Sequence, residues 1–220
     1  MRVVVAVLAS MLLAGDVRAQ ASAPTGAAVP SNKGYVEAVA QSAFSNVTSQ
    51  SYGVELGITI VPNLQIFVEA GQTGNAATRE LGANAQLIAG GLSQSQSNVA
   101  FSVKAPVAFG VAGVKFMIPV TGTKAQPYVL GGGGMAKVKQ NVTFTIAGTD
   151  VTSTLGQFGG TLGTDTSGDF TKPMVVFGGG VAYPMWRQIV LDFQYRFGRI
   201  FAEDTPITVS RAGIGIGVRF

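Results

Sequence analysis

The chain has 220 residues, the size of one ordinary domain, and only 12% of them are charged, against about 25% in typical soluble domains. It contains neither Cys nor His, which excludes disulfides, thiolate metal sites and the commonest general base and metal ligand. Its net charge of +4 is too small and too scattered to indicate nucleic-acid binding, and its mean hydropathy of +0.36 comes without any run of about 18 consecutive apolar residues.

The N-terminus predicts a secretory signal peptide over residues 1–19. Arg2 supplies positive charge, and the apolar run Val3–Ala14 is interrupted only by Ser10. Such a run is too short for a membrane-spanning helix, and small residues near Ala19 suit cleavage there, with Ala21 and Ala23 as alternatives. Residues 20–33 are rich in Ala, Ser, Pro and Gly and lack periodicity, so we expect a flexible periplasmic lead-in.

From residue 34 onward the chain shows a series of strand patterns in which apolar residues alternate with polar residues or glycine. In the clearest early one, Tyr52, Val54 and Leu56 alternate with Gly53 and Glu55. Pro106 falls inside the fourth pattern, so we expect an edge, a bulge or a break there. The eight predicted strands cover residues 34–44, 51–60, 64–72, 99–118, 127–145, 173–183, 188–198 and 207–220.

The connections alternate between long and short. Tight turns are predicted at residues 61–63, 119–126 and 184–187, and longer loops at 45–50, 73–98, 148–172 and 199–206. Within 73–98, four apolar residues recur at helical spacing, so a short helix is expected on Leu81, Ala85, Ile88 and Leu92. Short turns at one end and long loops at the other are typical of outer-membrane barrels, in which the long loops are extracellular.

The final strand shows most clearly what such a barrel requires. Ala212, Ile214, Ile216, Val218 and Phe220 share one face, and the other face carries only glycine and arginine. A soluble lipocalin-like barrel would place the apolar face inside, whereas a membrane barrel places it toward lipid. The signal peptide, the low charge and the glycine-plus-charge face favour the membrane. We therefore predict an all-β fold, an eight-stranded antiparallel up-and-down transmembrane β-barrel over residues 34–220.

The inward parity collects a balanced set of charges. A barrel of about eight strands is filled by its own side chains, so these charges must pair or find water. We expect a salt-bridged plug with a structural role; a narrow gated pore or a proton path is the functional alternative. The predicted lumen charge cluster consists of Glu37, Glu55, Glu69, Asp192, Lys115, Arg196, Arg211 and Arg219.

The aromatic residues are expected to form two interface girdles, although aromatics also favour strands in general. The predicted girdle at the turn side consists of Tyr35, Phe116, Tyr128, Tyr183, Trp186 and Phe220. The predicted girdle at the loop side consists of Phe44, Tyr52, Tyr195, Phe197 and Phe201. The glycine run Gly131–Gly134 lacks the Lys-Ser/Thr and the helix of a phosphate-binding loop, so strand glycines are the better interpretation.

Together these features resemble the small outer-membrane β-barrel family, which includes the transmembrane domain of outer membrane protein A and the opacity proteins. The chain's end resembles the signal that the barrel-assembly machinery recognises, a terminal aromatic preceded by apolar residues at alternate positions. That signal would be Ile214, Ile216, Val218 and Phe220. Val218 departs from the family pattern, where an aromatic is common, and so does Gly213. The resemblance implies outer-membrane lipid, lipopolysaccharide and the assembly machinery as partners.

We expect a structural or surface-interaction role, such as envelope integrity, adhesion or binding through the loops, whose ligand the sequence does not name. The alternative is a narrow porin-like channel for small solutes. An enzyme acting on envelope lipids is disfavoured because no His is present. We expect no cofactor, no metal and no nucleic-acid partner.

Overall fold

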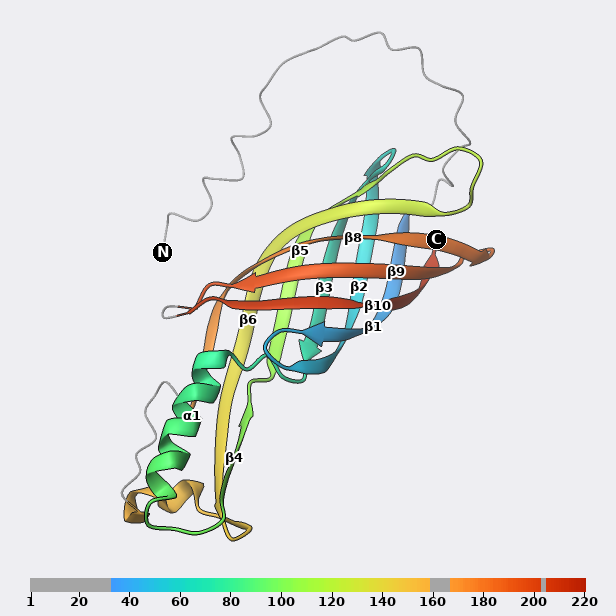
Figure 1. Ribbon diagram of the computed structural model, residues 1–220. Coiled ribbons are helices and arrows are strands. Elements are labelled where there is room, and N and C mark those ends of the chain that lie inside the picture. The colour runs from blue at the N-terminus through green and yellow to red at the C-terminus, as the bar shows by residue number, and fades with distance from the viewer. Residues whose placement is uncertain (1–32, 159–166, 203–204) are drawn as a thin grey trace, which may run out of the picture.

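The computed structural model describes residues 33–158, 167–202 and 205–220, and its strands close into a barrel (Figure 1). Every pairing is antiparallel, and the ring runs β1-β2-β3-β5-β6-β8-β9-β10. These eight strands are β1 Gly34–Phe44, β2 Thr48–Val61, β3 Leu64–Thr73, β5 Val107–Met117, β6 Gln126–Ile146, β8 Gly168–Trp186, β9 Ile189–Ile200 and β10 Ile207–Arg219. The predicted fold class, an eight-stranded antiparallel transmembrane β-barrel, is confirmed.

The two ends of the described barrel sequence close the ring. Strand β1 pairs with β10 from Tyr35↔Arg219 to Phe44↔Ser210. The backbone groups of Gly34 and Phe220 complete this ladder with two reciprocal N–H···O hydrogen bonds of 3.0 Å. Because the sheet closes on itself, its ring strands leave no long unpaired edge in the lipid.

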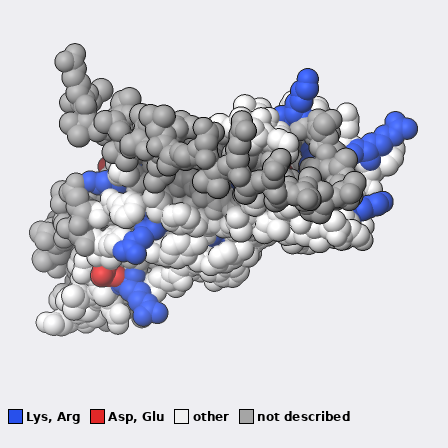
Figure 2. Space-filling model, turned by 90° about the horizontal axis from the view of Figure 1, so that it is seen from above, with Lys and Arg blue, Asp and Glu red and all other residues white. Residues whose placement is uncertain are grey.

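Alternation along the strands separates an apolar outer wall from a mixed interior. Leu56, Ile58 and Ile216 are all more than half exposed, as expected of side chains that face lipid. Phe67, on the inward parity, is fully buried in the lumen. On the face shown in Figure 2, the Lys and Arg side chains that stand out do so toward the two ends of the molecule.

The tight turns lie together at one end of the barrel, here called the turn end. Asn63 closes the β2–β3 turn with a φ of 70°, a conformation that Asn tolerates better than most residues. The predicted turn at 184–187 was wrong in extent: β8 continues to Trp186, and the turn is formed by Arg187 and Gln188. Pro184 is accommodated beside a register shift between Pro184 and Trp186, where a missing N–H is tolerated.

The opposite end, the loop end, carries more regular structure than the sequence suggested. The predicted fourth strand is two strands, β4 Val99–Lys104 and β5, separated at Ala105 and Pro106. Strand β8 begins at Gly168, so residues 168–172 belong to the sheet and not to the predicted loop. They are strand because β6 has 21 residues and offers them a partner as far as Gln140↔Gly168.

Beyond the ring, β6 continues out of the barrel and builds a small unit, here called the loop-end unit. It contains β4, the helix α1 Arg79–Leu92, the short β7 Thr149–Asp150 and the 3-10 helix η1 Thr152–Phe158 (Figure 1). The predicted helix in residues 73–98 is therefore present. The predicted signal peptide lies outside the described residues, as do residues 20–32 of the lead-in and 159–166 of the second loop. No described helix is long and apolar enough to cross a membrane.

Candidate functional site

The strand register sets three acidic side chains side by side in the lumen. Glu37 of β1 lies opposite Glu55 of β2, which lies opposite Glu69 of β3. All three are at least 95% buried, and like charges directly opposite one another in a sheet destabilise it. This acidic row therefore needs cations from elsewhere in the barrel.

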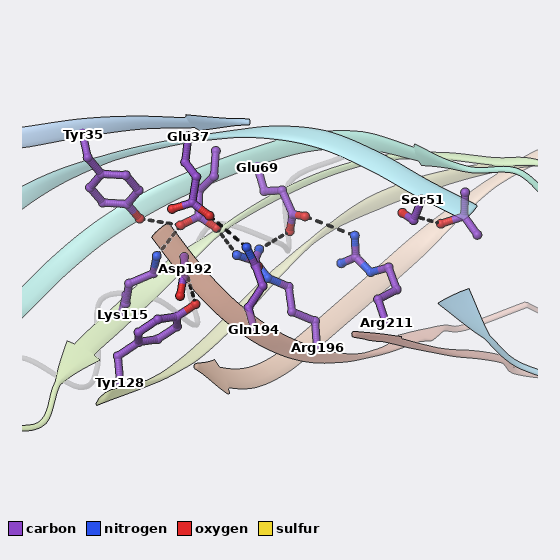
Figure 3. Close-up of polar contacts among 12 residues, drawn as sticks. Tyr35, Glu37, Ser51, Glu69, Lys115, Tyr128, Asp192, Gln194, Arg196 and Arg211 are labelled. Carbon is purple, nitrogen blue, oxygen red and sulfur yellow. Dashed lines mark hydrogen bonds and ion pairs between the residues drawn. The ribbon is translucent and has the colours of Figure 1, made fainter. Parts of the chain in front are cut away.

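The cations come from the other side of the lumen. Arg196 of β9 and Arg211 of β10 are directly opposite each other in register, so they too would repel if left alone. Figure 3 shows the two guanidinium groups extending toward the acidic row. The two like-charged sets are thus arranged to neutralise each other across the barrel.

Glu55 is the most connected carboxylate of this cluster. One oxygen, Oε1, accepts from Lys115 Nζ at 2.5 Å and from the hydroxyl of Tyr35 at 2.5 Å. The other oxygen accepts from Arg196 Nη2, and the Glu55, Lys115 and Arg196 side chains are at most 4% exposed. Arg196 also donates from Nη1 to Glu69 at 2.5 Å, and Arg211 donates to the second oxygen of Glu69 at 3.1 Å.

The remaining predicted lumen charges have neutral hydrogen-bond partners. Glu37 accepts from the Gln194 amide at 2.8 Å, and Asp192 accepts from the Tyr128 hydroxyl at 2.6 Å. Arg219, partly buried near the turn end, donates to the Gln126 amide oxygen at 2.5 Å. The structure thus brings Glu55, Glu69, Lys115, Arg196 and Arg211 into one ion-pair network, with Glu37, Asp192 and Arg219 beside it.

Aromatic rings complete the lining, and two of them correct the predicted turn-side girdle. Tyr35 and Tyr128 are buried in the lumen, and the Lys115 ammonium lies 4.6 Å and 4.5 Å from their ring centres. Tyr35 is two residues from Glu37 on the same strand, so the sequence pattern already placed its side chain on the inward face. Arg211 similarly lies 4.2 Å from the ring centre of Phe109. These cation–π contacts help to hold desolvated cations.

Two inward glycines explain how such large side chains fit. A Cβ on Gly57 would lie 2.1 Å from the ring of Tyr35, and a Cβ on Gly215 would lie 1.8 Å from the carboxylate of Glu37. The glycines that alternate with apolar residues along β2 and β10 therefore leave room for side chains from β1. The run Gly131–Gly134 lies within β6, as predicted for strand glycines.

The side chains around the ion-pair network are closely packed at the turn end. The cavity at the turn end of the lumen, bordered by Glu37, Lys115, Tyr128 and Asp192, has a volume of about 10 Å³, room for one water molecule. Within the described ranges, no group of three or more His, Cys, Asp and Glu side chains is arranged to hold a metal ion. Chemically, the lumen can hold charges in fixed positions.

The apolar core of the barrel continues into the loop-end unit. Leu81, Ala85, Ala89 and Leu92 form the buried face of α1, where Ala89 replaces the predicted Ile88, which is only partly buried. The hydroxyl of Thr78 caps the helix by accepting from the Leu81 N–H at 3.2 Å. The core of this unit also includes Val142, Phe144, Val151 and Leu155.

Asn75 joins the helix to the strand break, a role that the sequence did not reveal. Its amide oxygen accepts from the N–H groups of Ala77 at 3.0 Å and Ala105 at 2.8 Å, and its amide nitrogen donates to the Val103 carbonyl at 3.2 Å. At the far end of the unit, hydrogen bonds from the Thr152 side chain and backbone lower the pKa of the Asp150 carboxyl. These side-chain bonds order segments whose composition is that of a loop.

The predicted assembly-signal residues occupy the outer wall of the closing strand. Ile214, Ile216, Val218 and Phe220 are all exposed on the lipid-facing side, with Phe220 at the turn end. They form a continuous apolar stripe next to the seam between β1 and β10.

Comparison with known proteins supports the fold. No protein-family model and no curated protein matches the sequence. Among solved structures, Neisserial surface protein A is 14% identical over 85% of this chain and 96% of its own, with a TM-score of 0.52. A major outer membrane protein from Thermus thermophilus is 11% identical over 85% of this chain and 99% of its own, also with a TM-score of 0.52. The chain therefore has the fold of the small eight-stranded outer-membrane β-barrels, as the resemblance predicted.

Proposed function

We propose that the protein resides in the outer membrane, where its barrel is a closed anchor that holds the loop-end unit at the cell surface. The role is structural or one of surface interaction. The observation that carries this proposal is the filled lumen, in which Arg196 bridges Glu55 and Glu69 across the barrel. A transport channel needs an open path, whereas this interior leaves room for one water molecule near its turn end.

The loop-end unit supports the surface part of the proposal. Its helix and strands bury a shared apolar core, so it presents a preordered surface instead of free loops. Preordering lowers the entropy that binding must overcome. In outer-membrane barrels the longer connections face the exterior, and in this orientation residues 73–98 and 148–158 are extracellular.

We expect the closing strand to carry the signal for assembly, through Ile214, Ile216, Val218 and Phe220. Their exposure beside the β1–β10 seam supports this, because an assembly factor can reach them before the ring closes. The role is non-enzymatic in this proposal, since the chain has no His and its buried carboxylates are held by hydrogen bonds or ion pairs. Phospholipid and lipid A profiles should not change when the protein is overproduced.

Planar-bilayer recording of the purified, folded protein tests the closed lumen. We expect no steady current at moderate voltage. A stable open conductance would favour the alternative, a narrow porin-like channel for small solutes.

Protease shaving of intact cells tests the orientation, because cleavage should fall within the loop-end unit. Cleavage of intact cells at the turn end would contradict this orientation. Recovery of the protein as a detergent-free soluble monomer would contradict the membrane assignment.

A further inference from the structure

The outer wall of the barrel is hollowed at the loop end. A groove of about 640 Å³ lies there, and its lining includes Gln50, Tyr52, Gln72 and Lys137. The register places Tyr52 of β2 beside Gln72 of β3, Gln72 beside Ala108 of β5, and Ala108 beside Lys137 of β6. The side chains of Tyr52, Gln72, Ala108 and Lys137 are exposed on the outward parity. The groove therefore opens toward the surroundings of the barrel and not into the lumen.

The groove is basic. Lys137 and Lys139 are exposed along one side of it, and Lys104 is exposed on β4 just beyond the strand break. The one acidic residue in its lining, Asp169, is opposite Lys139 in register and lies 3.2 Å from the Lys137 ammonium. Both side chains of that pair are about half exposed, and exposed ion pairs contribute little, so Lys137 can exchange Asp169 for another anion.

The rest of the lining suits a sugar. Tyr52 is half exposed, and its hydroxyl donates to the Gln50 side-chain oxygen at 2.5 Å, while Gln72 lies beside it. Amide and phenol groups beside an aromatic face provide donors and acceptors for sugar hydroxyls. Phosphate groups bind the ammonium groups of lysines.

Below the groove, the lipid-facing wall carries a patch of small residues, here called the trough. Ala70 of β3 is opposite Gly110 of β5, and Ala112 of β5 is opposite Gly133 of β6, all on the outward side. A Cβ placed on Gly110 would meet no atom within 4 Å, so the space in front of it is open. The trough lies on the same strands as the groove, and larger apolar side chains, Val54 and Met135, are exposed on either side of it.

We propose that the groove binds the phosphorylated sugar headgroup of a lipid of the surrounding leaflet, with an acyl chain lying in the trough. Lys137 and Lys139 bind the phosphate, Tyr52 and the two glutamines contact the sugar, and the small residues accept the chain. The continuity of a polar, basic groove with an apolar trough fits an amphipathic ligand better than a soluble anion. This inference rests on the proposed membrane location.

The test uses the folded mature protein in phosphatidylcholine nanodiscs doped with diphosphoryl lipid A, with bound lipid counted by native mass spectrometry after transfer to detergent. We expect lipid A to be retained in preference to phosphatidylcholine. Lys137→Gln and Lys139→Gln should each lower retention about fivefold, the effect of one basic residue near an anionic lipid surface, and the loss should shrink at high salt. The matched control is Lys33→Gln with Lys124→Gln, which removes two exposed lysines at the turn end.

Two further variants sharpen the test. Asp169→Asn should raise retention, because it frees Lys137 and removes a negative charge from the groove. Gly110→Leu should lower retention without moving the backbone, because its side chain occupies open space in the trough. Dephosphorylated lipid A should be retained less than diphosphoryl lipid A, and inorganic phosphate or glucosamine 6-phosphate should compete only weakly.

Equal retention by the lysine variants and the parent protein would overturn the inference, as would equal binding of dephosphorylated lipid A. Strong competition by glucosamine 6-phosphate would mean a site for soluble anions and would overturn the lipid assignment. Heat-modifiable gel migration is recorded for every variant. If the parent protein does not show heat-modifiable migration, the proposed membrane barrel itself is contradicted. If the parent protein shows heat-modifiable migration but no lipid preference, only the lipid site in the groove is contradicted.

Discussion

Replacing Glu55 by Gln should destabilise the barrel more than any single change at its surface. The carboxylate is fully buried; one oxygen accepts from Lys115 and Tyr35, and the other from Arg196. Gln has the same shape but turns one of these acceptors into an NH₂ group, which faces a donor. Whichever oxygen is replaced, at least one buried cation loses its hydrogen-bonded partner.

The expected loss is about 3–5 kcal/mol, the usual cost of removing one partner from a buried ion pair. Adding Lys115→Met to Glu55→Gln restores the charge balance, so the double variant should be less destabilised than the sum of the two single variants. Glu80→Gln is the matched control, because Glu80 is an exposed carboxylate in the first turn of α1 and should change stability by less than about 0.5 kcal/mol.

Urea unfolding in lipid vesicles measures these differences. Trp186 is the only tryptophan, and it is exposed on the lipid-facing side at the turn end, so its fluorescence reports the loss of the folded, inserted state. A Glu55→Gln loss below about 1 kcal/mol, similar to that of Glu80→Gln, would refute the reasoning. It would mean that water screens the lumen charges, and it would agree with a conducting channel.

Three other changes test the wall, the lumen packing and the closing strand. Ile216→Arg places a charge on the lipid-facing wall and should lower the stability of the inserted barrel by about 2–4 kcal/mol if residue 216 lies near the bilayer midplane. The measurement is the yield of heat-modifiable protein, which should fall. Normal insertion would contradict the outward parity of Ile216. Gly215→Ala puts a methyl group where the Glu37 carboxylate lies, so the free energy of unfolding should fall by about 1–3 kcal/mol, and an unchanged value would show that Glu37 moves without penalty. Phe220→Ala should slow assembly in cells far more than it weakens the folded barrel in vitro, whereas equal effects would indicate a purely structural role.

Much of the barrel could be predicted from local pattern. Period-two alternation located β1 at its observed bounds and β3 to within one residue, and it placed Phe67 and the eight lumen charges on the inward parity. The prediction failed where a strand has the composition of a loop. Residues 168–172 were predicted as loop, yet they are strand because β6 extends beside them. Tyr35 was assigned to a girdle by residue type, although its parity already placed it with Glu37.

The sequence alone determined that this protein is a series of strands, each with one apolar and one polar face. Because such strands must keep their apolar side chains in lipid and their backbone groups paired, they must form a closed sheet. Which charges meet was decided by the tertiary structure. Glu55 and Arg196 are 141 residues apart, and only the register around the closed ring sets an acidic row opposite an arginine pair. The loop-end unit was decided in the same way, because α1 and β4 have a core only where β6 continues beyond the barrel.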